Sequence, residues 1–252
     1  VMAQLDPLVG DIPGNAARAI EAVREARIEH GADIVVFPEL FLSGYPPEDL
    51  LLRPSMETRL REARALMASK VASDVLVIIG YPGVREGRCY NLAGLLYNGQ
   101  WEAEYAKQAL PNYQVFDEQR YFTPGTETLV YEHKGAKLGI VICEDLWDGV
   151  PVKAAAQAGA EVLVSLHASP YHQDKPAERL RLLEKHAQDT QLPIVYVNTI
   201  GGQDELVFDG GSCCVNASGE LQVLAPYWQA GLMPVQFLQT SATVWEPQAG
   251  EI

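Results

Sequence analysis

The sequence lacks any apolar run long enough to cross a membrane. Its most hydrophobic segments, such as DVLVIIG at residues 74–80 and EVLVSL at residues 161–166, are far shorter than the roughly 18 residues that a spanning helix needs. The first residues, VMAQLDPLVGD, have neither the basic flank nor the long apolar stretch of a secretory signal peptide. We therefore expect no membrane association and a cytoplasmic location.

An excess of positive charge is also missing. The chain has 19 Lys and Arg residues against 33 Asp and Glu residues, which gives a formal net charge of −14 at pH 7. A groove that follows phosphates would have to work against this negative field. Nucleic acid is therefore not an expected partner.

The chain has few cysteines, and they form no CxxC pair. They are Cys89, Cys143, Cys213 and Cys214. If Cys213 and Cys214 lie on a strand, their side chains point to opposite faces of the sheet. This spacing argues against a disulfide framework and against a zinc site, and it favours reduced thiols in a reducing compartment. We expect no metal ion.

Repeats and linkers are absent as well. No internal repeat, charge block or Ser/Gly-rich linker divides the chain, so we expect a single domain over residues 1–252. Val- and Ile-rich segments alternate with longer segments of helical periodicity, which is typical of a layered α/β fold. Asn98-Gly99 and Ser218-Gly219 are hairpin signals, so some strands pair antiparallel in a mixed sheet.

The predicted elements are distributed along the chain as far as residue 224. Strands are expected at Met2–Leu5, Ile34–Phe37, Val75–Gly80, Leu92–Tyr97, Trp101–Tyr105, Leu129–Tyr131, Lys137–Ile142, Val162–Leu166, Ile194–Asn198, Ser212–Asn216 and Leu221–Leu224. Helices are expected at Asn15–Glu29, Glu57–Ala72, Val152–Ala158 and Ala177–Thr190. The tail from about Pro234 is weakly patterned and receives no assignment.

Three polar residues stand where predicted apolar strands end. Glu39 follows the run VVFP, where proline cannot continue a central strand, and its apolar neighbours would partly desolvate a carboxylate suited to a general base. Lys107 stands just after the predicted strand Trp101–Tyr105 and could stabilise an oxyanion or draw a thiol toward thiolate. Cys143 ends a third apolar run. Each has an ordinary alternative, which is a solvated acid, a solvated lysine or a buried core thiol.

The segment after Cys143 favours a nucleophile over a core thiol. GIVICEDLW passes from an apolar strand to two acids, and VPVKAAAQAGA then resembles a helix with Asp148 or Gly149 near its N-cap and Pro151 in its first turn. A strand, a tight turn and a helix would present a side chain at the sheet edge, as a nucleophile elbow does. The two adjacent acids raise the pKa of the thiol, so a thiolate here would need a cation or a base nearby.

These segments resemble the signature segments of the nitrilase, or carbon–nitrogen hydrolase, superfamily. They are VVFPELFLSGYPPEDLL around Glu39, YAKQALPNYQVFDEQRYF around Lys107 and GIVICEDLW around Cys143, in the order that the superfamily uses. Within the superfamily, the phrases SGYPPEDLL, CEDLW, ASPYH and GGQDELVFDGGS are similar to the N-terminal glutaminase domain of glutamine-dependent NAD⁺ synthetases. The resemblance extends from about Val1 to about Leu224.

The resemblance implies a fold and a set of residue roles. The fold would be an α/β four-layer αββα sandwich, in which two mixed β-sheets pack face to face with helices outside. Glu39 would be the general base, Lys107 the oxyanion stabiliser and Cys143 the nucleophile. Glu118, in VFDEQRYF, matches a second glutamate that positions the lysine.

A further set of residues matches positions that contact glutamine in this subfamily. They are Tyr113, Glu144 and Ser169. Their ordinary alternatives are a packed aromatic residue, a solvated acid and a turn residue before proline. The resemblance therefore implies a small-molecule substrate that is bound through both its ammonium and its carboxylate ends.

The implied reaction is hydrolysis of glutamine to glutamate and ammonia through a cysteine thioester, with no metal or organic cofactor. The related synthetases also carry a C-terminal domain that uses ATP and Mg²⁺, and no such segment occurs in these 252 residues. We therefore expect a glutaminase domain excised from a longer chain, which supplies ammonia for amidation of nicotinic acid adenine dinucleotide to NAD⁺. The superfamily also implies a homo-oligomer.

Two other functions stay open at this point. One is a stand-alone aliphatic amidase or nitrilase of the same superfamily, with the same three residues and another substrate. The other is a binding or regulatory module that retains the fold without turnover.

Overall fold

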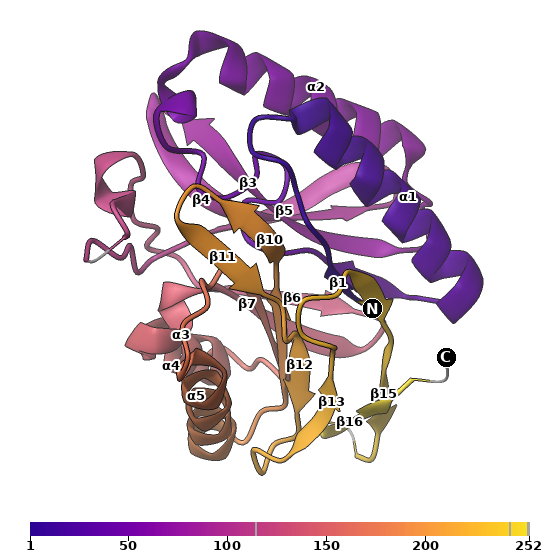
Figure 1. The fold of residues 1–252 in the computed structure, drawn as a ribbon. Coiled ribbons are helices and arrows are strands. Elements are labelled where there is room, and N and C mark those ends of the chain that lie inside the picture. The colour runs from indigo at the N-terminus through magenta and orange to yellow at the C-terminus, as the bar shows by residue number, and fades with distance from the viewer. Residues whose placement is uncertain (114, 242, 251–252) are drawn as a thin grey trace.

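Two six-stranded mixed sheets form the centre of the computed structural model, which describes residues 1–113, 115–241 and 243–250 (Figure 1). The first sheet contains, in spatial order, β14 (Gly231–Met233), β1 (Met2–Gln4), β2 (Ile34–Val36), β3 (Leu76–Arg85), β4 (Arg88–Tyr97) and β5 (Gln100–Ala106). The second contains β13 (Leu221–Leu224), β12 (Cys213–Val215), β9 (Ile194–Asn198), β8 (Val162–His167), β7 (Ala136–Ile142) and β6 (Leu129–His133). Parallel neighbours and antiparallel hairpins occur in both sheets.

Helices and two small hairpins complete the fold. The helices are α1 (Ile12–His30), α2 (Pro54–Lys70), α3 (Glu144–Asp148), α4 (Val150–Gln157) and α5 (Lys175–Thr190), with 3-10 turns η1 (Glu48–Leu52) and η2 (Glu118–Arg120). The small hairpins pair β10 (Ile200–Gln203) with β11 (Leu206–Asp209) and β15 (Val235–Gln239) with β16 (Trp245–Ala249). Within the described ranges, none of the helices has both the length and the apolarity needed to cross a bilayer.

The elements stack in four layers, as the αββα prediction requires. Figure 1 shows α1 and α2 on the outer side of the first sheet and α4 and α5 beside the second. Ile79 packs in the apolar cluster under α1 and α2, whereas its neighbour Ile78 packs in the cluster between the two sheets. Val141 and Leu183 belong to a third cluster, between the second sheet and its helices. The continuous apolar run VLVII is thus explained by burial of both faces of β3.

The predicted elements are present, with shifts of a few residues at their ends. Both predicted hairpin turns occur, between β4 and β5 and between β12 and β13. Cys213 and Cys214 do point to opposite faces, the first toward the helices and the second into the layer between the sheets. Helix α1 ends before Gly31, as predicted, and Gly31 has the left-handed φ of 59° that glycine commonly adopts at the C-terminal end of a helix.

Several elements escaped the sequence analysis for physical reasons. β10 contains two adjacent glycines, and β16 contains Pro247, so neither resembles a strand. β14 has three residues and pairs Met233 with Met2 at the other end of the chain, which local pattern does not reveal. The segment after Cys143, expected to be a turn, is the five-residue helix α3.

The strand directions bring the candidate residues to one region. β2 runs parallel to β3, and two antiparallel steps through β4 return β5 to the same direction. Glu39 and Lys107, which follow β2 and β5, therefore lie at one edge of the first sheet. β7 and β8 are parallel, so Cys143 and Ser169 lie at one edge of the second sheet.

The layer between the sheets should contribute strongly to stability. Ile78 is 0% exposed in that layer, so Ile78→Ala should lower the free energy of unfolding by about 2–5 kcal/mol through lost burial and a cavity. Ile28 on α1 is 58% exposed, so Ile28→Ala should change it by less than about 0.5 kcal/mol. Denaturant unfolding measures both values. Similar losses in the two variants would contradict this layer assignment.

Candidate active site

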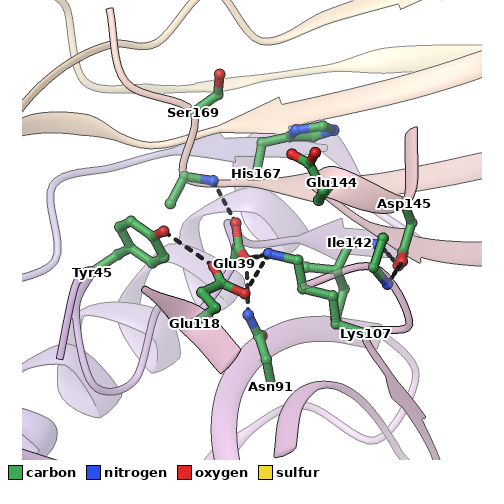
Figure 2. Close-up of polar contacts among 12 residues, drawn as sticks. Glu39, Tyr45, Asn91, Lys107, Glu118, Ile142, Glu144, Asp145, His167 and Ser169 are labelled. Carbon is green, nitrogen blue, oxygen red and sulfur yellow. Dashed lines mark hydrogen bonds and ion pairs between the residues drawn. The ribbon is translucent and has the colours of Figure 1, made fainter. Parts of the chain in front are cut away.

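A buried lysine between two carboxylates forms the centre of the candidate site (Figure 2). Lys107 is 1% exposed, and its Nζ lies 2.7 Å from Oε1 of Glu39. The same Nζ lies 2.9 and 2.8 Å from the two carboxylate oxygens of Glu118. Glu39 and Glu118 are 1% and 5% exposed, so none of the three is a solvated surface residue. Because an unpaired buried charge is costly, each of these groups depends on the others.

The charges in this cluster keep the lysine protonated. Burial acts to lower the pKa of Lys107, but the carboxylates of Glu118 and Glu39 outweigh it and hold the pKa well above its ordinary value. Burial raises the pKa of Glu118 to about 7, although Lys107 opposes the shift. The hydroxyl of Tyr45 also donates to Oε1 of Glu118 at 3.1 Å. Near neutral pH the cluster can therefore take up or release a proton.

Asn91, a residue of β4 that the sequence did not point to, links the segment after β2 to the segment after β5. Its Nδ2 donates to Oε1 of Glu39 at 2.7 Å, and its backbone oxygen accepts from the amide of Lys107 at 2.9 Å. On the other side, the amide of Ala168, just after β8, donates to Oε2 of Glu39 at 3.0 Å. Glu39 thereby connects the first sheet to the second.

A close approach of two chain segments sets the position of Glu39. A Cβ atom on Gly80 of β3 would lie 2.3 Å from the backbone nitrogen of Leu40 and 2.5 Å from the oxygen of Pro38. Leu40 itself has a φ of 48°, an unfavourable value for a leucine. Only glycine allows this contact, so an isolated glycine within a predicted strand was the available signal for Gly80.

Cys143 occupies the bend that the sequence predicted. It follows β7 and precedes α3 with φ 44° and ψ −95°, which is a strained conformation for a non-glycine residue. Its amide donates to the oxygen of Leu166 at 2.9 Å. Gly149 and Pro151 begin α4 as expected. The bend is thus a nucleophile elbow in its geometry.

The resting thiol of Cys143 should be protonated. Cys143 is 7% exposed, and burial is the main cause that raises its pKa well above the ordinary value. Glu39 raises the pKa further, Lys107 lowers it, and the neighbouring Glu144 adds a smaller increase. The sequence predicted that the adjacent acids raise the pKa of the thiol, and Glu144 does so, but burial has the larger effect. A base is needed to remove the proton.

The predicted substrate residues fall into two groups. The hydroxyl of Tyr113 donates to both oxygens of Glu144 at 3.0 Å, and Tyr113 is 49% exposed. Ser169 is 3% exposed, and Nη2 of Arg179 donates to its backbone oxygen at 2.7 Å. Arg179 is itself held by an ion pair with Asp209 at 2.7 Å. Ser169 thus sits on a rigid buried network, whereas Tyr113 and Glu144 are more accessible.

A second lysine lies near this region and was not predicted. Lys175 is the first residue of α5, and its Nζ lies 3.8 Å from the centre of the Trp147 ring. Burial lowers its pKa, while the charges of Glu178, Cys143 and Glu144 act to raise it. Nothing in the surrounding sequence distinguishes Lys175 from a surface lysine. Its proximity to Cys143 is evident only in the fold.

The fold and the site now define the class of protein. The model of the carbon-nitrogen hydrolase family matches residues 2–245, so the chain belongs to the carbon–nitrogen hydrolase family. Within the described ranges, no group of three or more His, Cys, Asp or Glu side chains is placed to hold a metal ion. The class of protein is therefore that of the carbon–nitrogen hydrolase enzymes.

Within this family, the chain is similar to glutamine-dependent NAD⁺ synthetases. The chain is 42% identical to a glutamine-dependent NAD⁺ synthetase of Xylella fastidiosa over 241 residues. This matched segment covers 95% of this chain and 44% of that protein. The structure of glutamine-dependent NAD⁺ synthetase from Acinetobacter baumannii in complex with ADP matches with a TM-score of 0.94 and 38% identity, over 100% of this chain and 47% of that one. The chain thus spans less than half the length of these relatives.

A smaller relative also has the same fold. A Glu-to-Gln mutant of an amidase from Nesterenkonia sp. AN1 matches with a TM-score of 0.81 and 25% identity, over 91% of this chain and 89% of that chain. In that structure acrylamide has undergone Michael addition at the active-site cysteine. The chain is thus similar both to NAD⁺ synthetases and to an amidase of the nitrilase superfamily.

The shifted pKa of Glu118 predicts a pH dependence of stability. Its pKa is raised from 4.5 to about 7, so between these values the folded protein holds a proton that the unfolded chain has lost. Stability therefore falls as pH rises through this window. Glu118→Gln lacks this contribution, so unfolding free energies at pH 5 and pH 8 should differ less in the variant than in the wild type. A parallel decrease in both proteins would contradict the shift.

Proposed function

We propose that this chain is a glutamine amidohydrolase that releases glutamate and ammonia. The observation that carries the proposal is the placement of Cys143 at a strained bend beside the buried Lys107 and Glu39. These residue types fit nucleophile, electrostatic stabiliser and base. The similarity to glutamine-dependent NAD⁺ synthetases supports glutamine as the substrate.

In the proposed first half-reaction, Glu39 accepts the proton of the Cys143 thiol, whose raised pKa makes a base necessary. The sulfur attacks the side-chain amide carbon of glutamine. Lys107, held protonated by its two carboxylates, stabilises the oxyanion together with a backbone N–H at the bend. The amide nitrogen takes this proton from Glu39 and leaves as ammonia as the carbonyl re-forms, so a γ-glutamyl thioester remains on Cys143.

In the proposed second half-reaction, Glu39 removes a proton from water. The hydroxide adds to the thioester carbon, and the sulfur leaves to yield glutamate. Glu118 does not touch the substrate in this scheme. Its two short contacts to Nζ hold Lys107 in place while the charge on Glu39 changes. In this proposal, neither half-reaction of glutamine hydrolysis uses a metal ion or an organic cofactor.

The amidase relative supports the assignment of the nucleophile. An electrophilic amide adds to the active-site cysteine of the Nesterenkonia amidase, whose fold matches most of this chain. By similarity we assign the corresponding reactivity to Cys143. The same likeness supports the second candidate function, a stand-alone amidase with an aliphatic substrate.

Charged side chains near Cys143 fit the two ends of a free amino acid. Glu144, with the hydroxyl of Tyr113 on its carboxylate, would bind the ammonium group. Lys175, stacked on Trp147, and Ser169 would bind the carboxylate group. An aliphatic amide has neither charge, so these residues would favour glutamine.

The proposal extends to the chain as a domain. We propose that residues 1–252 act as the glutaminase domain of a larger synthetase, in which the ammonia amidates nicotinic acid adenine dinucleotide to NAD⁺. The coverage of less than half of each synthetase relative supports this arrangement. ATP and Mg²⁺ would serve only the synthetase domain, and assembly into a homo-oligomer stays a prediction.

Loss of the thiol should abolish turnover. Cys143→Ala should reduce glutamine hydrolysis by at least about 10⁴-fold, because no other group can form the thioester. Cys89→Ala is the matched control, since Cys89 is a half-buried thiol outside the site whose pKa burial raises to about 11. Coupled detection of glutamate measures both rates. Retained activity in Cys143→Ala, or its loss only in Cys89→Ala, would refute the assignment.

Removal of the second lysine should separate glutamine from simple amides. Lys175→Met should raise the KM for glutamine by about 10- to 100-fold through loss of a charged hydrogen bond, and should leave hydrolysis of propionamide within a few-fold. Lys153→Met on α4, an exposed lysine, is the control. If the wild type prefers propionamide to glutamine, the amidase alternative is the better one. Equal effects of Lys175→Met on both substrates would exclude the proposed contact.

A further inference from the structure

We propose that Asp145 is a positioning residue that fixes Lys107 and Cys143 relative to each other through four hydrogen bonds to their flanking segments. This inference rests on the proposed function only in assigning the nucleophile to Cys143 and the oxyanion contact to Lys107. Asp145 itself touches neither side chain in this arrangement. It acts through the backbone that carries them.

The two carboxylate oxygens of Asp145 contact different sheets. Oδ1 accepts from the amides of Gln108 at 3.0 Å and Ala109 at 2.8 Å, the two residues that follow Lys107. Oδ2 accepts from the amide of Ile142 at 2.9 Å, the residue that precedes Cys143. A single carboxylate thus joins the loop after β5 in the first sheet to the end of β7 in the second. Figure 2 shows Asp145 close to Ile142 at this junction.

A tyrosine hydroxyl is the fourth donor to Asp145. The hydroxyl of Tyr105, on β5 two residues before Lys107, donates to Oδ2 at 2.8 Å. Tyr105 is 2% exposed and belongs to the apolar layer between the sheets. The segment that carries Lys107 is therefore bound to Asp145 on both sides of the lysine.

The charge state of Asp145 agrees with this role. Its side chain is 0% exposed, and its four donors are all uncharged groups. Burial raises its pKa to about 6, while the donated hydrogen bonds act in the opposite direction. A protonated carboxyl would place an O–H against one of these donors. The ionised form is the one that can accept all four bonds at neutral pH.

The same contact stabilises the strained bend. Cys143 has a φ of 44°, which a non-glycine residue keeps only when its surroundings hold it there. The bond from the Ile142 amide to Asp145 closes the bend around Cys143, and the bond from the Cys143 amide to Leu166 anchors it to β8. Loss of the Asp145 carboxylate would release one of these two constraints.

An asparagine at this position cannot reproduce the contact. Each oxygen of Asp145 receives two donors, so in either orientation the amide nitrogen of the substituted side chain would face at least one backbone N–H. Asp145→Asn should therefore move the Lys107 loop away from the bend or move the bend itself. The side-chain volume is nearly unchanged, so packing is preserved.

Two matched controls exist on the outer side of the first sheet. Glu104 also accepts a short hydrogen bond from a buried tyrosine, Tyr81, at 2.6 Å, and pairs with Arg64 and Arg85. Tyr81 packs in the cluster under α1 and α2, away from the layer that contains Tyr105. Tyr81→Phe, on β3, therefore removes a buried tyrosine–carboxylate bond without changing the segments that carry Lys107 and Cys143. Glu104→Gln changes a residue of β5 next to Tyr105, but it removes contacts on the outer side of the sheet and none to Asp145.

The experiment measures alkylation of Cys143 by iodoacetamide, located by peptide mass analysis, together with kcat and KM for glutamine. In Asp145→Asn the alkylation rate constant and kcat should fall by roughly 10- to 100-fold, as expected for misplacement of reacting groups, with KM within about threefold. Tyr105→Phe should reduce both by a smaller factor. Tyr81→Phe and Glu104→Gln should alkylate at the wild-type rate.

A purely structural role gives a different result. It would lower only the fraction of folded protein, so the folded protein would be labelled at the wild-type rate constant and the unfolded fraction would appear as a separate phase, and that outcome overturns the proposal. If Asp145→Asn fails to fold, the comparison of Tyr105→Phe with Tyr81→Phe decides, and equal rate constants refute the inference. If the wild type is labelled at Cys143 in an Asp145-dependent manner without hydrolysing glutamine, the proposed substrate fails and the positioning role stands.

Discussion

The ion pair between Lys107 and its two glutamates is the contact on which the site depends. All three groups are buried, so none can lose its partners without leaving a desolvated charge. Lys107, just after β5, and Glu118, in the turn η2, are 11 residues apart in the sequence, whereas Glu39, in the loop after β2, is 68 residues from Lys107. The amide of Ala168, which donates to Glu39, links this cluster to the second sheet. The chemistry that we propose uses the same charges.

Backbone geometry is adapted to this cluster. Gly80 lets the Glu39 loop pass directly over β3, and Asn91 contacts both Glu39 and the backbone of Lys107. On the opposite sheet, the left-handed φ of Cys143 directs its side chain out of the strand direction. Each of these features breaks a local preference, and each lies within the site. Such conflicts between local preference and the global fold are expected at functional positions.

The sequence predicted the layered fold and the candidate residues for different reasons. Apolar runs in β3, β7 and β8 are visible because both sheet faces are buried, and GIVICEDLW marks a strand followed by a sharp bend. Asn91 and Lys175 were missed because their importance comes from contacts with segments distant in the sequence, which no local pattern encodes. β14 was missed for the same reason, since it pairs with β1 from the opposite end of the chain. Gly80 was missed although an isolated glycine in a predicted strand was a local signal for it. Asp145 was visible only as a neighbour of the thiol, and its bridging contacts required the structure.

The central claim is that Cys143 forms a covalent bond to the side-chain acyl group of glutamine. Mass analysis of protein mixed with glutamine and quenched in acid tests this claim most directly, because a thioester survives acid. The account predicts a γ-glutamyl adduct on the peptide that contains Cys143, present in the wild type and absent in Cys143→Ala. Turnover of glutamine without such an adduct, or an adduct on another residue, would contradict the account.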